Sequence, residues 1–189
     1  MAKVNFRLDT IKLKATRERL YSGKLKVAKE IPNGLFAFLG DYVVGESEIR
    51  NLETPTAALL KAEIPVLIHN PEINYKQDSK TDGALGAYRN RSGKVLRVFP
   101  LNKYDEISLS DDFFDTTGKP VIAIGDIYAI QENMEAGTQL KYSATAPADN
   151  KVYLKVTGIT NSHIPVFLGG DGAMFPSAYK MVDVEIIFA

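Results

Sequence analysis

Apolar residues recur at every second position through much of this chain, and this pattern most constrains its fold. Val152, Leu154 and Val156 alternate with polar residues, and the segment 182–186 repeats the pattern. A period of two places successive side chains on opposite faces of a β-strand. Turn-forming stretches such as "EAGT", "PADN" and "GGDG" separate these segments. The sequence therefore predicts a mainly β protein, whose body is an antiparallel β-barrel or β-sandwich.

Two apolar runs do not alternate. "LFAFLGD" (35–41) is almost continuously apolar and is echoed by "VIAIGD" (121–126), and a tyrosine follows each within two residues. Continuous apolar character is typical of a strand that is buried on both faces. Because Gly and Asp favour turns, we interpret the pair as one device used twice, a central strand stopped by a tight turn. Asp41 and Asp126 are then turn residues.

Further strands are predicted at 66–68, 95–99 and 107–109, and separately at "KVYLKVTGIT" and "IPVFLG" in the last third. Near the N-terminus the apolar parity changes after Asp9 and Thr10, which predicts two short strands or one strand with a bulge. Two segments compete as short helices. In "TPTAALLKAE", Thr54 is the expected N-cap before Pro55; in "SDDFFD", Ser110 is the expected cap.

The charge is distributed unevenly along the chain. Residues 1–30 hold nine Lys or Arg against three Asp or Glu, whereas the other residues hold fourteen against twenty. We therefore divide the chain into a basic, extended N-terminal arm (1–30), a β-rich body (31–118) and a second β-rich unit (119–189), with a soft boundary at Asp115–Lys119. The alternative is that residues 31–189 form a single β domain.

The bulk composition narrows the classes of function. The chain has no cysteine, so disulfides and thiolate chemistry are excluded. It shows neither a signal-peptide core nor eighteen consecutive apolar residues, so we expect no membrane partner. The zero net charge and the few aromatics of the arm argue against nucleic acid.

Several stretches imitate catalytic or cofactor sites. "GGDG" (169–172) has no second acid at ligand spacing, so we interpret it as a hairpin turn. "GALGAYRNRSGK" (83–94) is followed by a strand rather than by a helix and fails as a phosphate loop. His69 and His163 lie at strand ends, and no nucleophile elbow accompanies them. The acids at 105–106 and 111–115 are close together in the sequence, as the two acids of a glycosidase could be. Closeness in sequence does not give the distance between their carboxyl groups, on which glycosidase catalysis depends. We predict no enzyme, no cofactor and no metal.

Two basic groups are the expected contacts with a partner, although both are also consistent with a solvated surface. The arm would lie on an acidic surface of this body, of another copy or of a larger partner, and the loop cluster would pair with a partner's carboxylates. The residues are Lys3, Arg7, Lys12, Lys14, Arg17, Arg19, Arg89, Arg91, Lys94 and Arg97.

The order of features resembles that of a known family. A basic arm leads to "PNGLFAFLGD", then "NPEINY", then "RNRSGKVLRVFPLNKYDEISLS", then a capped turn and "GDIYAI". Over Ile31–Ile130 this is similar to the head-associated proteins of tailed bacteriophages, the auxiliary or decoration proteins of the outer capsid surface. The C-terminal third has no counterpart in that pattern.

The resemblance implies a non-enzymatic virion protein on the outer capsid surface, assembled in the host cytoplasm. It also implies a homo-oligomer, with a trimer favoured, that binds the major capsid protein and stabilises the head. Two alternatives remain: a tail or fibre component that recognises a host-surface glycan, and a small hydrolase that uses His69 or His163.

Overall fold

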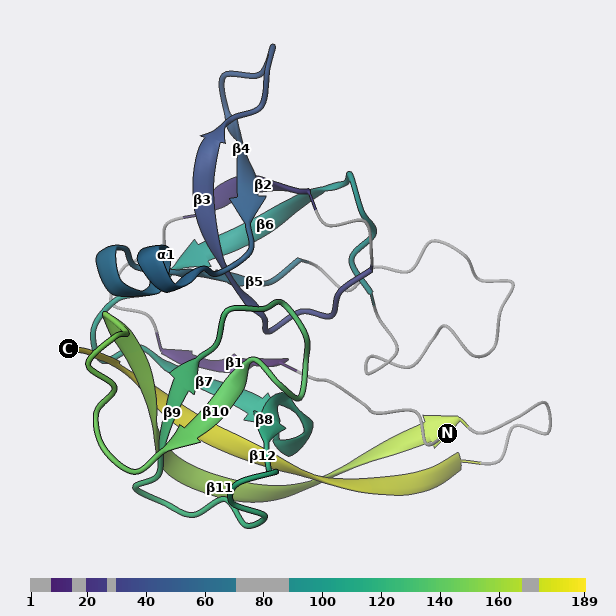
Figure 1. Ribbon diagram of the computed structural model, residues 1–189. Helices are drawn as coiled ribbons and strands as arrows, with labels where there is room; N and C mark the ends of the chain where they lie inside the picture. The colour runs from purple at the N-terminus through teal and green to yellow at the C-terminus, as the bar shows by residue number, and fades with distance from the viewer. Residues whose placement is uncertain (1–7, 15–19, 27–29, 71–88, 168–173) are drawn as a thin grey trace.

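We analysed a computed structural model of the chain. The described residues are 8–14, 20–26, 30–70, 89–167 and 174–189, and for 8–14, 162–167 and 174–179 the description is of the backbone path alone. The structure is mainly β, as the alternation predicted, and its strands form one closed barrel and one seven-stranded sheet (Figure 1).

The barrel has five strands in the order β2-β4-β3-β5-β6. Their bounds are β2 Tyr21–Leu25, β3 Phe36–Tyr42, β4 Ile49–Glu53, β5 Val66–Ile68 and β6 Val95–Pro100. All neighbours run antiparallel except β2 and β4, which are parallel. The run Leu35–Phe38 is wholly buried. This confirms the predicted burial on both faces for Leu35–Phe38, whereas Leu39, the last apolar residue of the run, is only half-buried.

A short helix, α1 (Ala57–Ala62), connects β4 to β5. Its N-cap is Thr56, whose hydroxyl accepts a hydrogen bond from the Leu59 amide. The expected cap, Thr54, lies two residues too early, because the helix begins only after the threonine that follows Pro55.

The second sheet has the order β1-β7-β12-β11-β9-β10-β8. Its strands are β1 Leu8–Lys14, β7 Glu106–Ser110, β8 Phe114–Asp115, β9 Ile127–Ile130, β10 Leu140–Ser143, β11 Val152–Phe167 and β12 Met174–Phe188. β10 and β8 are parallel and the other pairs antiparallel.

The register of β1 against β7 shifts between Asp9 and Lys14, so the change in apolar parity after Asp9 and Thr10 marks one strand with an irregularity. Between β7 and β8 lies the 3₁₀ turn η2 (Asp111–Phe113). Ser110 is at its N-cap position as expected, but the prediction that its side chain caps the turn is wrong, because that side chain makes no capping bond.

The second apolar run is not a buried strand. Val121 and Ile124 are exposed, and Asp126 accepts a hydrogen bond from the Ala123 amide within a turn. Only Ile127–Ile130, after the turn, enters the sheet. The interpretation of one device used twice is therefore wrong, although Asp126 is a turn residue as expected.

β11 and β12 are much longer than their neighbours. The sequence predicted separate strands at "KVYLKVTGIT" and "IPVFLG", but one sixteen-residue strand, β11, spans both segments as far as Phe167. Its pairs with β12 continue from Val152 and Phe188 to Phe167 and Met174. This hairpin extends well beyond the rest of the sheet (Figure 1).

The barrel and the sheet share one hydrophobic core. Gly34, at φ +92°, lies against Phe113: a Cβ there would stand 2.7 Å from the Phe113 Cζ atom. The buried Gln139 side-chain amide accepts from the Phe36 N–H and donates to the Phe36 carbonyl, both at 2.8 Å. Gln139, which directly precedes β10 of the second sheet, thus satisfies both the N–H and the carbonyl of Phe36 in the barrel.

The two sheets do not follow the charge boundaries of the sequence. The chain leaves the barrel after Pro100 and joins the second sheet at Glu106. Within the predicted arm, Leu8–Lys14 is a strand of the second sheet and Tyr21–Leu25 a strand of the barrel, so these segments are not a free extension. The division into units 31–118 and 119–189 stays a prediction.

Candidate interaction surfaces

The ten predicted contact residues separate into groups with different surroundings. Lys12 and Lys14 belong to β1, at one edge of the second sheet. Arg89 is half-buried, and burial lowers its pKa while Glu30 opposes that shift. The Arg91 Nε lies 3.8 Å from Glu30 Oε1. The rest of the arm's group, Lys3, Arg7, Arg17 and Arg19, lies outside the described residues.

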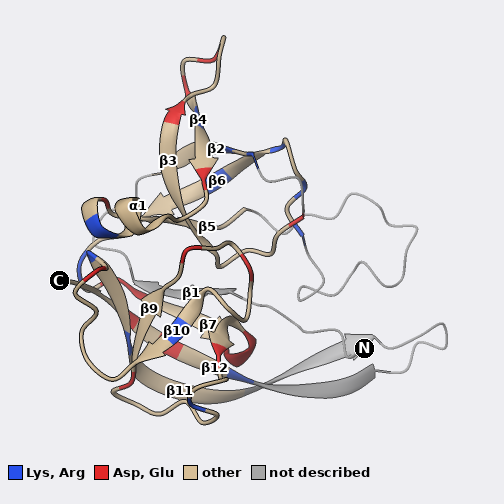
Figure 2. Ribbon diagram, in the orientation of Figure 1, with Lys and Arg blue, Asp and Glu red and all other residues tan. Residues whose placement is uncertain are grey.

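Lys94 and Arg97 lie with Lys24 on the outside of the barrel. In β6 the buried Leu96 and Val98 point inward, so Arg97 and its neighbour Val95 point outward. Across the strands, Lys24 pairs with Val95 in register, and Val95 is 47% exposed. Figure 2 shows Lys and Arg along β2, β6 and the turn before β6. We use the term basic face for Lys24, Lys94, Val95 and Arg97.

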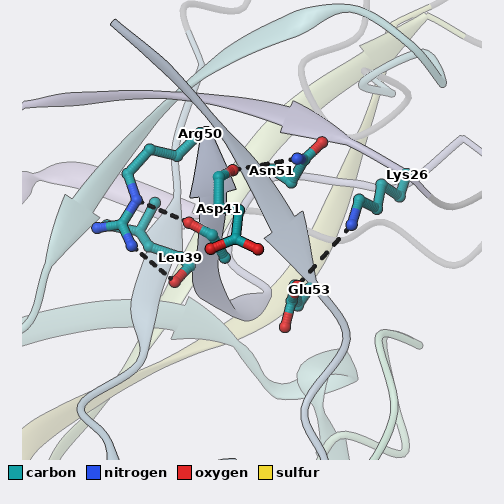
Figure 3. Close-up of polar contacts among 7 residues, drawn as sticks. Lys26, Leu39, Asp41, Arg50, Asn51 and Glu53 are labelled. Atoms are coloured by element: carbon teal, nitrogen blue, oxygen red, sulfur yellow. Dashed lines mark hydrogen bonds and ion pairs between the residues drawn. The ribbon is translucent and has the colours of Figure 1, made fainter. Parts of the chain in front are cut away.

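None of the three cations of the basic face has an ion-pair partner among the described residues. An acid of the neighbouring strand β4, Glu53, faces Lys26 instead, with 3.8 Å between Nζ and Oε1 (Figure 3). The basic face therefore has Val95 as its apolar centre, and no acid in the described part of the chain pairs with the three cations around it.

A second surface, which sequence reasoning missed, is the end of the β3–β4 hairpin. We use the term acidic tip for residues 42–48. Val44 at its end is 100% exposed and Tyr42 is 59% exposed, and Glu46 and Glu48 are exposed beside them. The hairpin stands away from the barrel (Figure 1). The signal available in the sequence is "VVGESE" between two strands, a turn glycine followed by acids.

Arg50 fixes the base of this hairpin. The register of β3 and β4 shifts between Leu39 and Tyr42, which marks a bulge at residues 40–41. The Arg50 guanidinium donates to the carbonyls of Gly40, at 2.7 Å, and of Leu39, at 3.2 Å (Figure 3). Its Cζ also lies 5.7 Å from the centre of the Tyr42 ring. The "LGD" motif is thus a bulge within a strand, and not the tight turn that we expected; Asp41 is a strand residue.

Further hydrogen bonds order the hairpin above the bulge. The Asn51 side chain donates to the Asp41 carbonyl at 3.0 Å (Figure 3). The amide of Val43 donates to the Ile49 carbonyl, and that of Glu46 to the Val43 carbonyl. Gly45 takes a φ of +85°, which suits glycine in such a turn. The tip therefore presents its side chains on a preformed backbone.

The long hairpin exposes main-chain edges. β9 pairs with β11 only at Tyr153–Lys155, and β7 pairs with β12 only at Met181–Glu185. Beyond Asn161 and Lys180, the described residues of β11 and β12 pair only with each other. With respect to the described part of the chain, the outward N–H and C=O groups there are unpaired, and such an edge can accept a further strand.

Three acids considered for glycoside hydrolysis border a cavity of about 550 Å³. Asp111, Asp112 and Asp115 lie there with Lys180 and with an apolar wall that includes Val182. The Asp115 carboxylate accepts from the Thr117 amide at 2.9 Å, and hydrogen bonds from Thr117 lower the pKa of Asp115. A carboxyl whose pKa is lowered stays ionised near neutral pH, so Asp115 is unsuited to donate a proton to a leaving group.

The other acid pair, at 105–106, does not belong to that cavity. Asp105 is buried and accepts hydrogen bonds from both the amide and the side chain of Asn102. It therefore stabilises the turn before β7.

The histidines lie in different settings. His69 is half-buried, its ring centre lies 5.6 Å from that of Phe99, and burial lowers its pKa. His163 belongs to β11, at a position where only the backbone is described.

The part of the chain that the structure describes contains neither a metal-binding cluster nor a membrane-spanning helix. There, no group of three or more His, Asp or Glu is placed to hold a metal ion. No helix of that part is long and apolar enough to span a membrane. The "GGDG" stretch lies outside the described residues.

The motifs "PNG", "NPE" and "RNR" meet at one buried asparagine. Asn33 donates to the Asn70 carbonyl and accepts from the Asn70 amide, at 2.8 and 3.0 Å. It also accepts from the Asn90 side chain at 2.8 Å. These residues hold together the two ends of the connection between β5 and β6, which is a structural role.

Comparison with protein-family models, with curated proteins and with solved structures finds no match for this chain.

Proposed function

We propose that this protein is a structural component of a tailed-bacteriophage head, which binds the lattice of the major capsid protein on its outer surface and stabilises it. The observation that carries the proposal is the β11–β12 hairpin, whose outer edges have no strand partner among the described residues beyond Asn161 and Lys180. An exposed strand edge binds an extended segment of another protein through main-chain hydrogen bonds.

One further feature supports the same function. The strand β1, which includes Lys12 and Lys14, forms one edge of the second sheet and so offers a second main-chain edge. Many identical copies on a lattice also add their contacts, so that a modest affinity at each contact still holds the assembly together.

Co-sedimentation with heads that lack this protein tests the proposal. The intact protein should sediment with the heads at low salt, and less of it at high salt because charged contacts are screened. Failure of the intact protein to sediment at low salt contradicts the proposal.

A shortened hairpin tests the observation itself. Asn161 and Lys180 are paired, so residues 162–179 can be replaced by an Asn-Gly turn without changing the register. We expect head binding to weaken by about tenfold or more, with the circular dichroism spectrum of the body retained. A folded shortened variant that binds as tightly as the intact protein excludes the hairpin as the contact.

The N-terminal contacts need a shorter deletion than the charge pattern suggests. Removing residues 1–22 would also delete β1 and the start of β2, so removal of residues 1–7 is the appropriate variant.

Electron microscopy of labelled protein on whole particles separates the head from the alternative position on a tail or fibre, where a host glycan would be the ligand.

A further inference from the structure

The acidic tip and the basic face have complementary chemistry. The tip carries the fully exposed Val44 with Glu46 and Glu48 beside it. The face carries the half-exposed Val95, bordered by Lys94 and Arg97. Each surface thus has an apolar centre and charges of one sign, and the signs are opposite.

Within one copy, the two surfaces do not satisfy each other. No ion pair among the described residues joins Glu46 or Glu48 to Lys94 or Arg97. The tip also points away from the barrel that bears the face (Figures 1 and 2).

The tip is preformed, which lowers the cost of binding. Arg50 holds the bulge at its base, and the Val43 and Asn51 hydrogen bonds order the backbone above it. Because the backbone is already fixed, little conformational entropy is lost when the tip meets a partner.

We propose that the acidic tip of one copy binds the basic face of a second copy. Val44 then contacts Val95, while Glu46 and Glu48 pair with Lys94 and Arg97. The two surfaces differ, so the contact is head-to-tail: each copy uses its tip on one neighbour and its face on another, which generates a ring or an open chain.

The contact is expected to be weak in solution and dependent on salt. A hairpin tip covers less than the roughly 1,200–2,000 Å² that stable interfaces bury, and exposed ion pairs are screened by salt. Copies held side by side on a lattice would gain from it through their high local concentration. That last consequence rests on the proposed function, but the contact itself does not.

Sedimentation velocity of the isolated protein tests the contact. At about 50 mM NaCl the weight-average sedimentation coefficient should rise with protein concentration, and at about 500 mM NaCl the association constant should fall by roughly fivefold or more. A wild-type protein that stays monomeric over the whole concentration range at low salt overturns the proposal.

Charge exchange gives the sharper test. The tip variant Glu46→Lys/Glu48→Lys and the face variant Lys94→Glu/Arg97→Glu should each lose self-association. When mixed, they should associate again, because the basic tip of one meets the acidic face of the other and the remaining tip and face are unchanged. Failure of the mixture to associate overturns the proposal.

Matched controls place the same charge changes elsewhere. Glu132, Asp149, Lys141 and Lys155 are exposed residues outside the barrel. The double variants Glu132→Lys/Asp149→Lys and Lys141→Glu/Lys155→Glu should each associate as the wild type does. If they lose association equally, general electrostatics and not the tip is responsible, and the proposal is overturned.

Head binding distinguishes this inference from the proposed function. A tip variant that fails to self-associate but still sediments with heads supports the contact between copies. A tip variant that self-associates normally but no longer binds heads assigns the tip to the capsid and contradicts the inference.

Discussion

Gly34 lies at a point where the barrel packs closely against residues of the second sheet's side. It lies just before the buried β3, with a φ of +92°, and has no room for a side chain because Phe113 and Leu109 pack against it. The motif "PNG" indicates a turn by itself. The tertiary structure adds that the missing Cβ also allows the barrel to approach Phe113.

Replacement of Gly34 by alanine is expected to lower the free energy of unfolding by about 3 kcal/mol or more. About 1–2 kcal/mol comes from the positive φ, and the rest from displacement of Phe113 in a packed core. Urea denaturation followed by circular dichroism measures the change.

Gly93 is the matched control, since its φ is +72° and a Cβ added there would have no atom within 4 Å. Gly93→Ala should therefore cost only the contribution of the positive φ, about 1–2 kcal/mol. Equal losses for the two variants would show that close packing at Gly34 contributes nothing.

The β3–β4 hairpin shows how one side chain orders a whole element. The bulge at residues 40–41 interrupts the pairing of β3 and β4, and Arg50 from the opposite strand donates to the carbonyls of Leu39 and Gly40 beside it. A Gly-Asp pair after an apolar run is equally consistent with a turn and with a bulge, so local sequence does not separate them.

Arg50→Lys is expected to lower the free energy of unfolding by about 1–2 kcal/mol, because an ammonium cannot reproduce the planar donor pair at the Gly40 and Leu39 carbonyls. Chemical denaturation measures this. Arg97→Lys, at an exposed position of the same barrel, should change stability by no more than about 0.5 kcal/mol. A similarly small change at Arg50 would contradict its role at the bulge.

The molecule as a whole is held together by contacts between the barrel and the second sheet. Beside its two bonds to Phe36, Gln139 donates from Nε2 to the Asn133 carbonyl. The Lys151 amide donates to the Leu60 carbonyl near the end of α1. Together with the shared core, these contacts predict that both parts unfold in one cooperative transition.

Gln139→Leu should lower the free energy of unfolding by about 3 kcal/mol or more, because it leaves the buried polar groups of Phe36 without partners. Calorimetry and circular dichroism should give coincident transitions for the wild type. Gln131→Leu is the control, since the Gln131 side chain makes one longer bond, 3.3 Å, at a half-buried position, and its loss should be about 0.5 kcal/mol. Two separate transitions in the wild type would contradict the shared core.

Patterns along the chain were enough to predict the β class, the strands at 66–68, 95–99 and 107–109 and the burial of Leu35–Phe38, whereas for β1 they left one irregular strand and two short strands as alternatives. All of these follow from local rules, because alternation and continuous apolar runs report which faces of a strand are buried. Such patterns do not report partners, and "VIAIGD" therefore looked like "LFAFLGD" although Val121 and Ile124 are exposed.

Tertiary contacts select which strands share a sheet and which charges find a partner. Arg89 and Arg91 interact with Glu30, whereas Lys94 and Arg97 are exposed, and the cluster of basic residues at 89–97 gave no hint of that difference. The exposed end of the β3–β4 hairpin likewise depends on a tertiary contact, because Arg50 orders the base of the hairpin through the Leu39 and Gly40 carbonyls. Strand pairing and charge compensation depend on contacts between residues far apart in the chain, which no local pattern records.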